Sequence, residues 1–168
     1  MLRQLEAVGL GTPYRIAATG LAEVVYQVPV LEAPFVAVSK QLWRAPAVGR
    51  LVRSVAYRLA DRLRGTGREY RPVSIAGLPV RADASHWAVT DLYFANAEYE
   101  PQTFRYLADQ LPDAGVFVDI GANAGLLTLV AAARVGPRGR VFAFEPNPPV
   151  LEELKRHIAV NGFGDRVR

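Results

Sequence analysis

The strongest constraint on the fold of this chain is an apolar run that ends in a glycine-rich turn. Val116–Ile120 reads as a strand covered on both faces, Gly121–Gly125 as the turn, and residues 125–135 as a helix. A second strand follows over residues 140–144 and ends at Glu145. Strand, helix and strand in this order are typical of a right-handed crossover between parallel strands. The carboxyl-terminal half is therefore predicted to form part of a parallel, doubly wound α/β sheet.

Periodicity and the positions of glycine and proline predict the other elements. Helices are expected over 47–64, 101–111 and 148–161, and a short hairpin over 72–76 and 78–81 that turns at Gly77. Residues 84–97 are aromatic and polar without a clean period, which indicates a loop with a short turn of helix. We expect a mainly helical region of unassigned role over residues 1–70, and the α/β domain over residues 71–168.

The first 38 residues give a weaker pattern. Leu2–Val8 fits one short helix, and Thr12-Pro13 fits the start of another, with proline in the first turn. Pro29 and Pro34 are expected to break the pattern that follows.

The helix over residues 47–64 carries an apolar stripe opposite several arginines. The stripe consists of Val48, Leu51, Val52, Val55, Leu59 and Leu63. One interpretation is a basic amphipathic helix on an anionic membrane surface. The other is an ordinary docking helix with a solvated arginine face, and we favour it because such stripes are the default for surface helices.

The charge of the chain is unevenly spread. Residues 1–84 hold twelve Lys/Arg and six Asp/Glu, a balance of +6, and residues 85–168 hold eight and ten, a balance of −2; together these give +4. Only Lys40 and Lys155 among the twenty basic residues are lysines. This bias towards arginine is typical of a GC-rich coding sequence, so we predict no nucleic-acid partner from the charge alone.

Residue types and patterns that the sequence lacks exclude several classes of protein and of site. The sequence has no cysteine, which excludes a disulfide framework, a thiolate metal site and a cysteine nucleophile. It has no run of eighteen apolar residues and no signal-peptide pattern at its start, so a cytoplasmic location is expected. His86 and His157 have no partner at metal-ligand spacing; we expect packing or surface roles for them and no metal.

Polar residues gather where the two expected strands end. Asp119 is next to the end of the first strand and Glu145 follows the second. Open α/β sheets bind ligands at this edge. Gly121 and Gly125 let the backbone turn sharply and let a ligand approach closely. Asn123 tolerates unusual backbone angles and both donates and accepts hydrogen bonds.

Glu145 and Asn147 follow the second strand. A carboxylate at position 145 can accept hydrogen bonds from both hydroxyls of a ribose, each worth about 1.5–3 kcal/mol. Asn147 is expected to cap the next helix ahead of Pro148 and to lie near the base of the ligand.

The spacing of the glycines discriminates between two nucleoside ligands. A dinucleotide site requires Gly-x-Gly-x-x-Gly, and the corresponding positions hold Gly121, Asn123 and Leu126. Two of the three glycines are missing, and Asp119 would repel a pyrophosphate. The same carboxylate suits the ammonium of an amino-acid moiety. The residues therefore favour S-adenosylmethionine, with a nicotinamide dinucleotide as the weaker alternative.

These motifs resemble the FkbM-type family of S-adenosylmethionine-dependent methyltransferases. The segments that carry the resemblance are Tyr99-Glu100-Pro101, Val116–Gly125, Val141–Pro148, Leu154-Lys155 and Asn161-Gly162. The resemblance covers about residues 72–168 and does not extend to residues 1–70.

This resemblance implies a class I methyltransferase (Rossmann-like) fold, S-adenosylmethionine as cofactor, and O-methylation of a small-molecule acceptor such as a sugar or natural product. The cofactor-binding residues that it implies are Asp119 for the ammonium, Gly121, Ala122, Asn123 and Gly125 around the methionine part, Glu145 for the ribose, and Asn147. It supports no catalytic residue in this chain.

The family's sheet has further strands, and only the start of the third would fall at residues 166–168. We therefore expect the front part of a longer enzyme, without turnover by itself. Its strand over 116–120 would have an unpaired edge, and the apolar faces of helix 125–135 would be open to water.

The competing hypothesis is a non-catalytic interaction module whose arginine-rich helix contacts a membrane surface or an acidic partner. Of these two partners, the membrane surface is the less favoured. The oligomeric state is not predicted.

Overall fold

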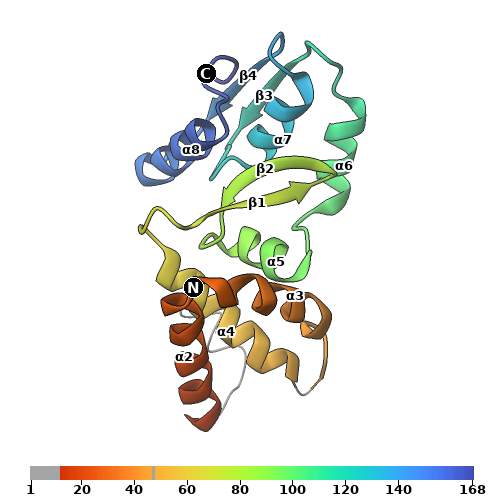
Figure 1. The fold of residues 1–168 in the computed structure, drawn as a ribbon. Coiled ribbons are helices and arrows are strands. Elements are labelled where there is room, and N and C mark those ends of the chain that lie inside the picture. The colour runs from red at the N-terminus through yellow and green to blue at the C-terminus, as the bar shows by residue number, and fades with distance from the viewer. Residues whose placement is uncertain (1–11, 47) are drawn as a thin grey trace. The chain divides into compact units, whose positions relative to one another are not determined.

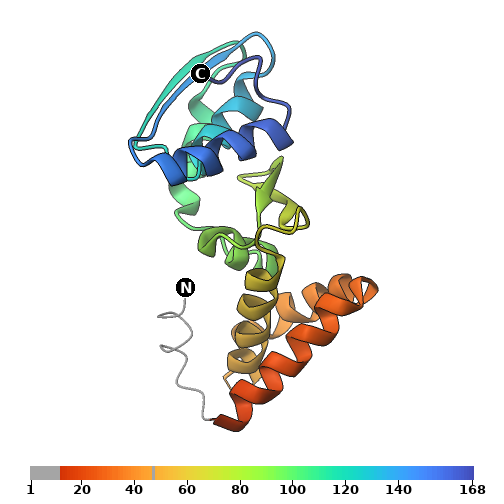
Figure 2. The ribbon, with the colours of Figure 1, turned by 90° about the vertical axis from the view of Figure 1, so that its left-hand side faces the viewer.

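The computed structural model describes residues 12–46 and 48–168, which form two compact units (Figures 1 and 2). The helical unit comprises the described part of Met1–Arg71 together with Asp83–Tyr99, and the α/β unit comprises Pro72–Ala82 and Glu100–Arg168. The expected single division after residue 70 differs from this, because Arg71 and residues 83–99 belong to the helical unit. The helix expected over Leu2–Val8 lies outside the described residues.

Proline and local sequence set the bounds of the first helices. The elements of the helical unit are α2 (Thr12–Gln27), η1 (Pro29–Leu31), α3 (Glu32–Leu42), α4 (Val48–Leu63) and α5 (Trp87–Ala95). Pro29 opens the short 3-10 helix between α2 and α3, and the chain bends by 112° there. The expectation that Pro34 breaks the pattern is wrong. Pro34 lies in the first turn of α3, where its missing N–H would have no partner within the helix.

Helix α4 is the centre of the helical unit. It packs against α2, α3 and α5. Val52, Val55 and Leu59 of the expected stripe are buried, as is Leu63 at its end. Two of its arginines bond within the unit, since Arg53 donates to the Trp43 carbonyl and Arg62 pairs with Glu23 at 3.0 Å. The structure therefore supports the docking-helix interpretation.

Helix α5 replaces the loop that we expected over residues 84–97, which is a correction. Its apolar residues surround the helix, so they produce no amphipathic period. Ala88, Val89, Leu92 and Phe94 are all buried. Burial of about half of its residues stabilises this helix, and the absence of a polar side removes the period that would predict it.

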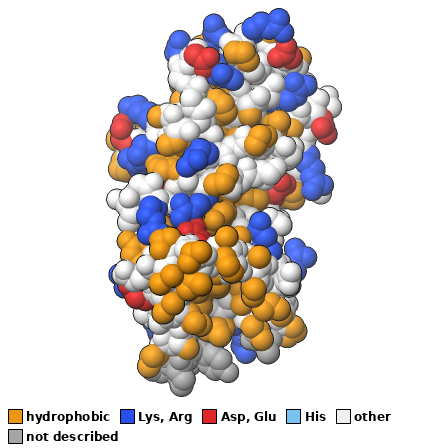
Figure 3. All heavy atoms as spheres, in the orientation of Figure 1, with side chains coloured by type: hydrophobic (Ala, Val, Ile, Leu, Met, Phe, Trp, Pro, Cys, Tyr) orange, Lys and Arg blue, Asp and Glu red, His pale blue; other side chains and the backbone are white. Residues whose placement is uncertain are grey.

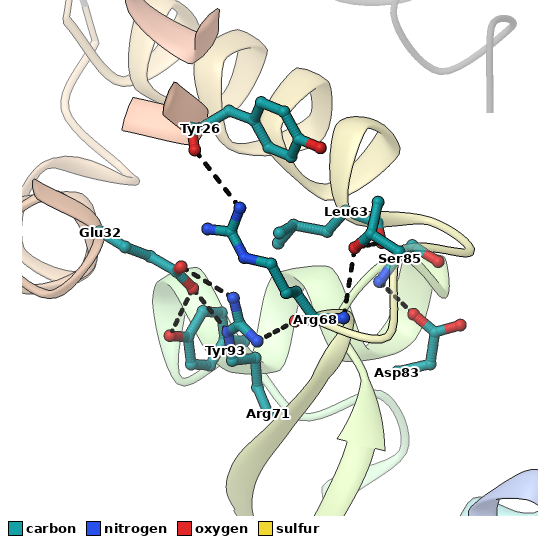
Figure 4. A network of polar contacts seen from close by, with 9 residues as sticks. Tyr26, Glu32, Leu63, Arg68, Arg71, Asp83, Ser85 and Tyr93 are labelled. Carbon is teal, nitrogen blue, oxygen red and sulfur yellow. Dashed lines mark hydrogen bonds and ion pairs between the residues drawn. The ribbon is translucent and has the colours of Figure 1, made fainter. Parts of the chain in front are cut away.

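A buried polar network joins three segments of the helical unit (Figure 4). Glu32 is buried at the start of α3, and its two carboxylate oxygens accept hydrogen bonds from Arg71 at 2.6 and 2.8 Å. The Tyr93 hydroxyl of α5 donates to the same carboxylate at 3.0 Å. Burial, followed by the charge of Glu32, raises the pKa of Tyr93 to about 12. Paired in this way, the buried charges of Glu32 and Arg71 are compensated.

The expected hairpin is confirmed. It consists of β1 (Tyr70–Ile75) and β2 (Leu78–Asp83), joined by Ala76 and Gly77. Both turn residues have positive φ, 50° and 81°, as a type I′ turn requires.

The α/β unit has the predicted order of helices and strands. Its elements are α6 (Pro101–Gln110), β3 (Val116–Ile120), α7 (Leu126–Val135), β4 (Arg140–Phe144) and α8 (Pro148–Val160). Strands β3 and β4 are parallel, with Val116 opposite Arg140 and Ile120 opposite Phe144. Val167 forms a parallel bridge with Val141 on the other edge of β4. This arrangement is compatible with part of a Rossmann-like sheet.

Two expectations about this sheet are wrong. Strand β3 is not covered on both faces, since Val116, Val118 and Ile120 are exposed. The apolar side of α7 is not open, since most of its residues are buried between the β3–β4 pair and α6. In Figure 2 the helices α7 and α8 lie on the same side of the pair. One layer of helices therefore covers one face of the sheet and leaves the other to solvent in the described part of the chain.

Candidate functional site

The sequence-predicted site lies where β3 and β4 end. Because the strands are parallel and Ile120 lies opposite Phe144, the turn after β3 and the loop after β4 share one edge of the sheet. The carbonyl of Phe144 accepts hydrogen bonds from the N–H groups of Gly121 and Ala122 at 2.9 and 3.0 Å. The end of β4 thus holds the start of the glycine turn.

Glu145 joins the two loops through its carboxylate. One oxygen accepts the N–H of Asn123 at 2.9 Å, and the other accepts the N–H of Asn147 at 2.8 Å. Glu145 is half-buried, so its side chain is still accessible to solvent. A carboxylate has about four acceptor positions. After these two bonds, each oxygen of Glu145 can still accept a hydrogen bond from a ligand hydroxyl.

Asp119 occupies the covered face of β3. It is 6% exposed, and its Oδ2 accepts the hydroxyl of Thr128 in α7 at 2.6 Å. Its neighbour Ile120 points the other way and is 84% exposed. Asp119 therefore connects the strand to the helix that follows the turn. Its contact with a ligand ammonium stays a prediction.

The two glycines of the turn have different roles. Gly121 has φ +79°, and a Cβ built there would meet no atom within 4 Å. Gly125 has φ +90°, and its Cβ would lie 2.2 Å from Cδ1 of Leu154, a buried residue of α8. Gly121 therefore serves the backbone conformation, and no described residue packs against it. Gly125 also makes room for a helix, a reason that differs from the ligand approach we expected.

The side chains of the two asparagines differ in whether they bond to the backbone. Asn123 has φ 52°, and its side-chain oxygen accepts the N–H of Ala124 at 2.8 Å. Asn147 stands at the N-cap of α8, but its side chain makes no capping bond, which corrects our expectation. Pro148 and Pro149 occupy the first two positions of α8. Of the two N–H groups that a cap can bond, at the second and third positions, only that of Val150 is therefore present.

His157 has a part in this site that the sequence did not predict. His157 of α8 is fully buried, and its Nδ1 lies 2.7 Å from the carbonyl of Ala124, so Nδ1–H donates to the turn. This is a packing role, as expected, but it positions the turn. Residues 124 and 157 are far apart in the sequence, and only their shared place between α7 and α8 indicates the contact.

His86 takes no part in this site. It lies in the helical unit, immediately before α5, and burial lowers its pKa. Across residues 12–46 and 48–168, we find no group of three or more His, Asp or Glu side chains placed to hold a metal ion.

Two known proteins match parts of the chain. A probable cobalt-precorrin-6B C(15)-methyltransferase (decarboxylating) from Pyrobaculum aerophilum is 33% identical over 85 residues, which cover 47% of this chain and 43% of that protein. The AMB antimetabolite synthetase AmbE from Pseudomonas aeruginosa is 46% identical over 48 residues, which cover 29% of this chain and 2% of that protein. The chain thus spans less than half the length of either relative.

The methyltransferase match supports a relation, at a coarse level, to S-adenosylmethionine-dependent methyltransferases and hence a transferase ancestry. It does not distinguish a subfamily. No family model matches the sequence, and no solved structure matches it.

Proposed function

We propose that the α/β unit binds S-adenosylmethionine as part of an FkbM-type methyltransferase that methylates an oxygen of a small molecule, such as a sugar or natural product. One observation carries this proposal. The carboxylate of Glu145 is fixed by the backbone N–H groups of Asn123 and Asn147 at the carboxyl ends of adjacent parallel strands. The methyltransferase relative supports the coarser part of this proposal, a relation to S-adenosylmethionine-dependent methyltransferases.

A fixed carboxylate at this position suits a ribose. Two neighbouring hydroxyls can each donate to one oxygen of Glu145, in charge-assisted bonds worth about 1.5–3 kcal/mol each. Both oxygens are already oriented by backbone N–H groups, so the side chain loses little freedom when the ligand binds.

The glycine turn would hold the amino-acid end of the cofactor. Its backbone is held at Gly121 and Ala122 by β4 and at Ala124 by His157. The buried carboxylate of Asp119 adds negative charge beneath the turn, which favours a ligand ammonium.

When bound, the cofactor supplies a methyl group on a sulfonium, which an acceptor oxygen can attack directly. The task of the protein is then to position the donor and the acceptor oxygen. In this chain the residues at the β3–β4 edge would orient the donor. We assign no residue to the binding of the acceptor. The chain spans less than half of either relative, so the first test concerns binding of S-adenosylmethionine and not methyl transfer.

Calorimetry with S-adenosylmethionine tests the proposal. Glu145→Ala should weaken binding by at least tenfold, because two charge-assisted hydrogen bonds are lost. Glu152→Ala is the matched control, because Glu152 is an exposed carboxylate on α8 that pairs with Lys155. Binding of NAD in place of S-adenosylmethionine, or equal affinity of wild type and Glu145→Ala, would overturn the assignment.

The competing hypothesis placed the interaction surface on α4. Helix α4 is the centre of the helical unit, and Arg53 and Arg62 bond within that unit. These contacts do not support the binding of a membrane surface or an acidic partner at α4.

A further inference from the structure

A large apolar surface covers the outside of the first two helices of the helical unit. In Figure 3 hydrophobic side chains gather over the region that Figure 1 labels α2 and α3. Its exposed large apolar residues are Ile16, Leu21, Val24, Val28, Val30, Leu31 and Val38. Val30, at the bend, is 76% exposed. We call this the α2–α3 apolar face. Contiguous exposed apolar patches on soluble domains mark sites of interaction.

Helix α2 is apolar on two opposite sides. Ala18, Ala22 and Val25 are buried in the core with α4. At helical spacing, Ile16 and Val24 fall on the opposite side, and both are exposed. A flank of α2 between these two sides is polar and carries Arg15, Thr19, Glu23 and Gln27. The outer side of α2 is therefore an exposed apolar strip beside this polar flank.

The same face lacks free charge. Between Ile16 and Ser39 the sequence has only two charged residues, Glu23 and Glu32. Glu23 pairs with Arg62 of α4 at 3.0 Å, and Glu32 is buried with Arg71. Both acidic groups on this stretch are therefore paired with arginines of the same unit.

Cations lie at both ends of the face. At the start of α2, Arg15, Thr19 and Arg58 line an open hollow of about 570 Å³ together with Ile16 and Gly20. The Nε of Arg58 is buried and has no hydrogen-bond partner among the described residues. We call this the Arg15 hollow.

At the other end, the residues that close α3 line a second hollow of about 330 Å³. Lys40, Gln41, Trp43 and Arg44 contribute, and Ala95 and Ala97 complete it. We call this the Lys40 hollow. The uncharged apolar face is thus flanked by two hollows that each present two cations.

We propose that the α2–α3 apolar face binds the surface of a lipid bilayer with anionic headgroups. The apolar side chains enter the boundary between headgroups and acyl chains, and the cations of the two hollows meet lipid phosphates. This division of roles is typical of helices that lie in the membrane interface. A second copy that docked through the same face is a poorer partner, because it would place its own cations of the two hollows against those of the first copy.

The geometry favours lying on the membrane over crossing it. No single helix within the described ranges has the length and apolarity to span a bilayer, although α2 and the η1–α3 segment pass that test as a bent pair. One side of α2 packs against α4, so only its outer side is open to lipid.

Vesicle flotation with the full chain tests the proposal. Wild type should float with phosphatidylcholine vesicles that contain phosphatidylglycerol, and Val30→Asp should lower its partition coefficient at least tenfold. Val30 is largely exposed, so its replacement should leave the fold intact, which circular dichroism can verify. Ile120→Asp is the matched control, because Ile120 is exposed on the α/β unit and its replacement should not change flotation.

The cations give a second, separate readout. The triple variant Arg15→Gln, Lys40→Gln, Arg44→Gln should lose about fivefold in partitioning to anionic vesicles for each cation removed. Its binding should also depend less on salt, with Arg58 as the one cation of the two hollows that remains. The apolar contribution to binding should remain.

Two results would overturn the proposal. One is equal flotation of wild type and Val30→Asp. The other is an absence of vesicle binding together with a dimer in light scattering that Val30→Asp converts to a monomer, which would make the face an interface between copies. Binding of S-adenosylmethionine is measured independently, so failure of this proposal and failure of the methyltransferase assignment remain distinguishable.

Discussion

At the scale of single residues, the glycine turn shows how two similar positions obey different constraints. Gly121 and Gly125 both have positive φ, which side chains disfavour by about 1–2 kcal/mol. Only Gly125 faces a neighbour, the buried Leu154 of α8. The turn is therefore fixed by helix packing on one side and by the carboxylate of Glu145 on the other.

These two glycines allow a matched prediction. Gly121→Ala should lower the free energy of unfolding by about 1–2 kcal/mol, through backbone strain alone. Gly125→Ala should cost about 1–3 kcal/mol more, because its methyl group overlaps Leu154 in a packed region. Urea denaturation of both variants measures the difference. Equal losses would show that Leu154 moves away freely and that packing does not set this position.

At the scale of elements, the Glu32–Arg71–Tyr93 network ties α3, α5 and the start of β1 together. Its members lie 39 and 61 residues apart from Glu32 in the sequence, so no local pattern indicates it. The network is buried, and removal of one member would leave the others without compensation.

The network predicts a stability loss at high pH. Tyr93 has a pKa raised from 10.0 to about 12, so the folded state favours the neutral phenol. The contribution of the neutral Tyr93 phenol to the free energy of unfolding is complete below pH 10. It is lost as the pH rises towards 12, and the loss is about 2 to 3 kcal/mol at most.

Comparison with Tyr93→Phe isolates this effect. The stability difference between wild type and the variant should be larger at pH 9 than at pH 12 in urea denaturation. Titration of ¹³Cζ-labelled tyrosine gives the pKa directly. A difference that stays constant across this range would contradict a protonated, hydrogen-bonded Tyr93.

At the scale of the whole molecule, the chain forms two compact units with separate cores. The proposed cofactor site belongs to the α/β unit, and the α2–α3 apolar face belongs to the helical unit. Both tryptophans of the chain, Trp43 and Trp87, are in the helical unit, so tryptophan fluorescence reports directly on that unit.

Because both tryptophans lie in the helical unit, we predict that fluorescence and circular dichroism will report different unfolding transitions in core variants of the two units. Leu59→Ala in the core of α4 should lower the fluorescence-monitored stability by about 2–5 kcal/mol. Leu154→Ala should change the helical signal in circular dichroism and have a smaller effect on the fluorescence transition. Coincident shifts of both probes in both variants would show that the two units unfold as one.

Much of the α/β unit could be predicted from sequence. The alternating order of strands and helices, the turn at Gly121–Gly125 and the short hairpin all depend on local signals, and the structure has each of them. The grouping of Asn123, Glu145 and Asn147 also followed from sequence, because parallel strands bring their carboxyl ends together.

Other features were decided only by tertiary structure. Helix α5 has no period to detect, and its burial among other helices stabilises it. His157 contacts Ala124, but the two residues are far apart in the sequence, and no local pattern predicts that they meet.

The sequence by itself determined the order of the elements and the chemistry at the strand ends, because both depend on neighbours along the chain. The tertiary structure decided which apolar faces are covered. The exposed sides of β3 and α2 are apolar, as core-facing sides are, and only the packing of distant segments decides that they stay uncovered.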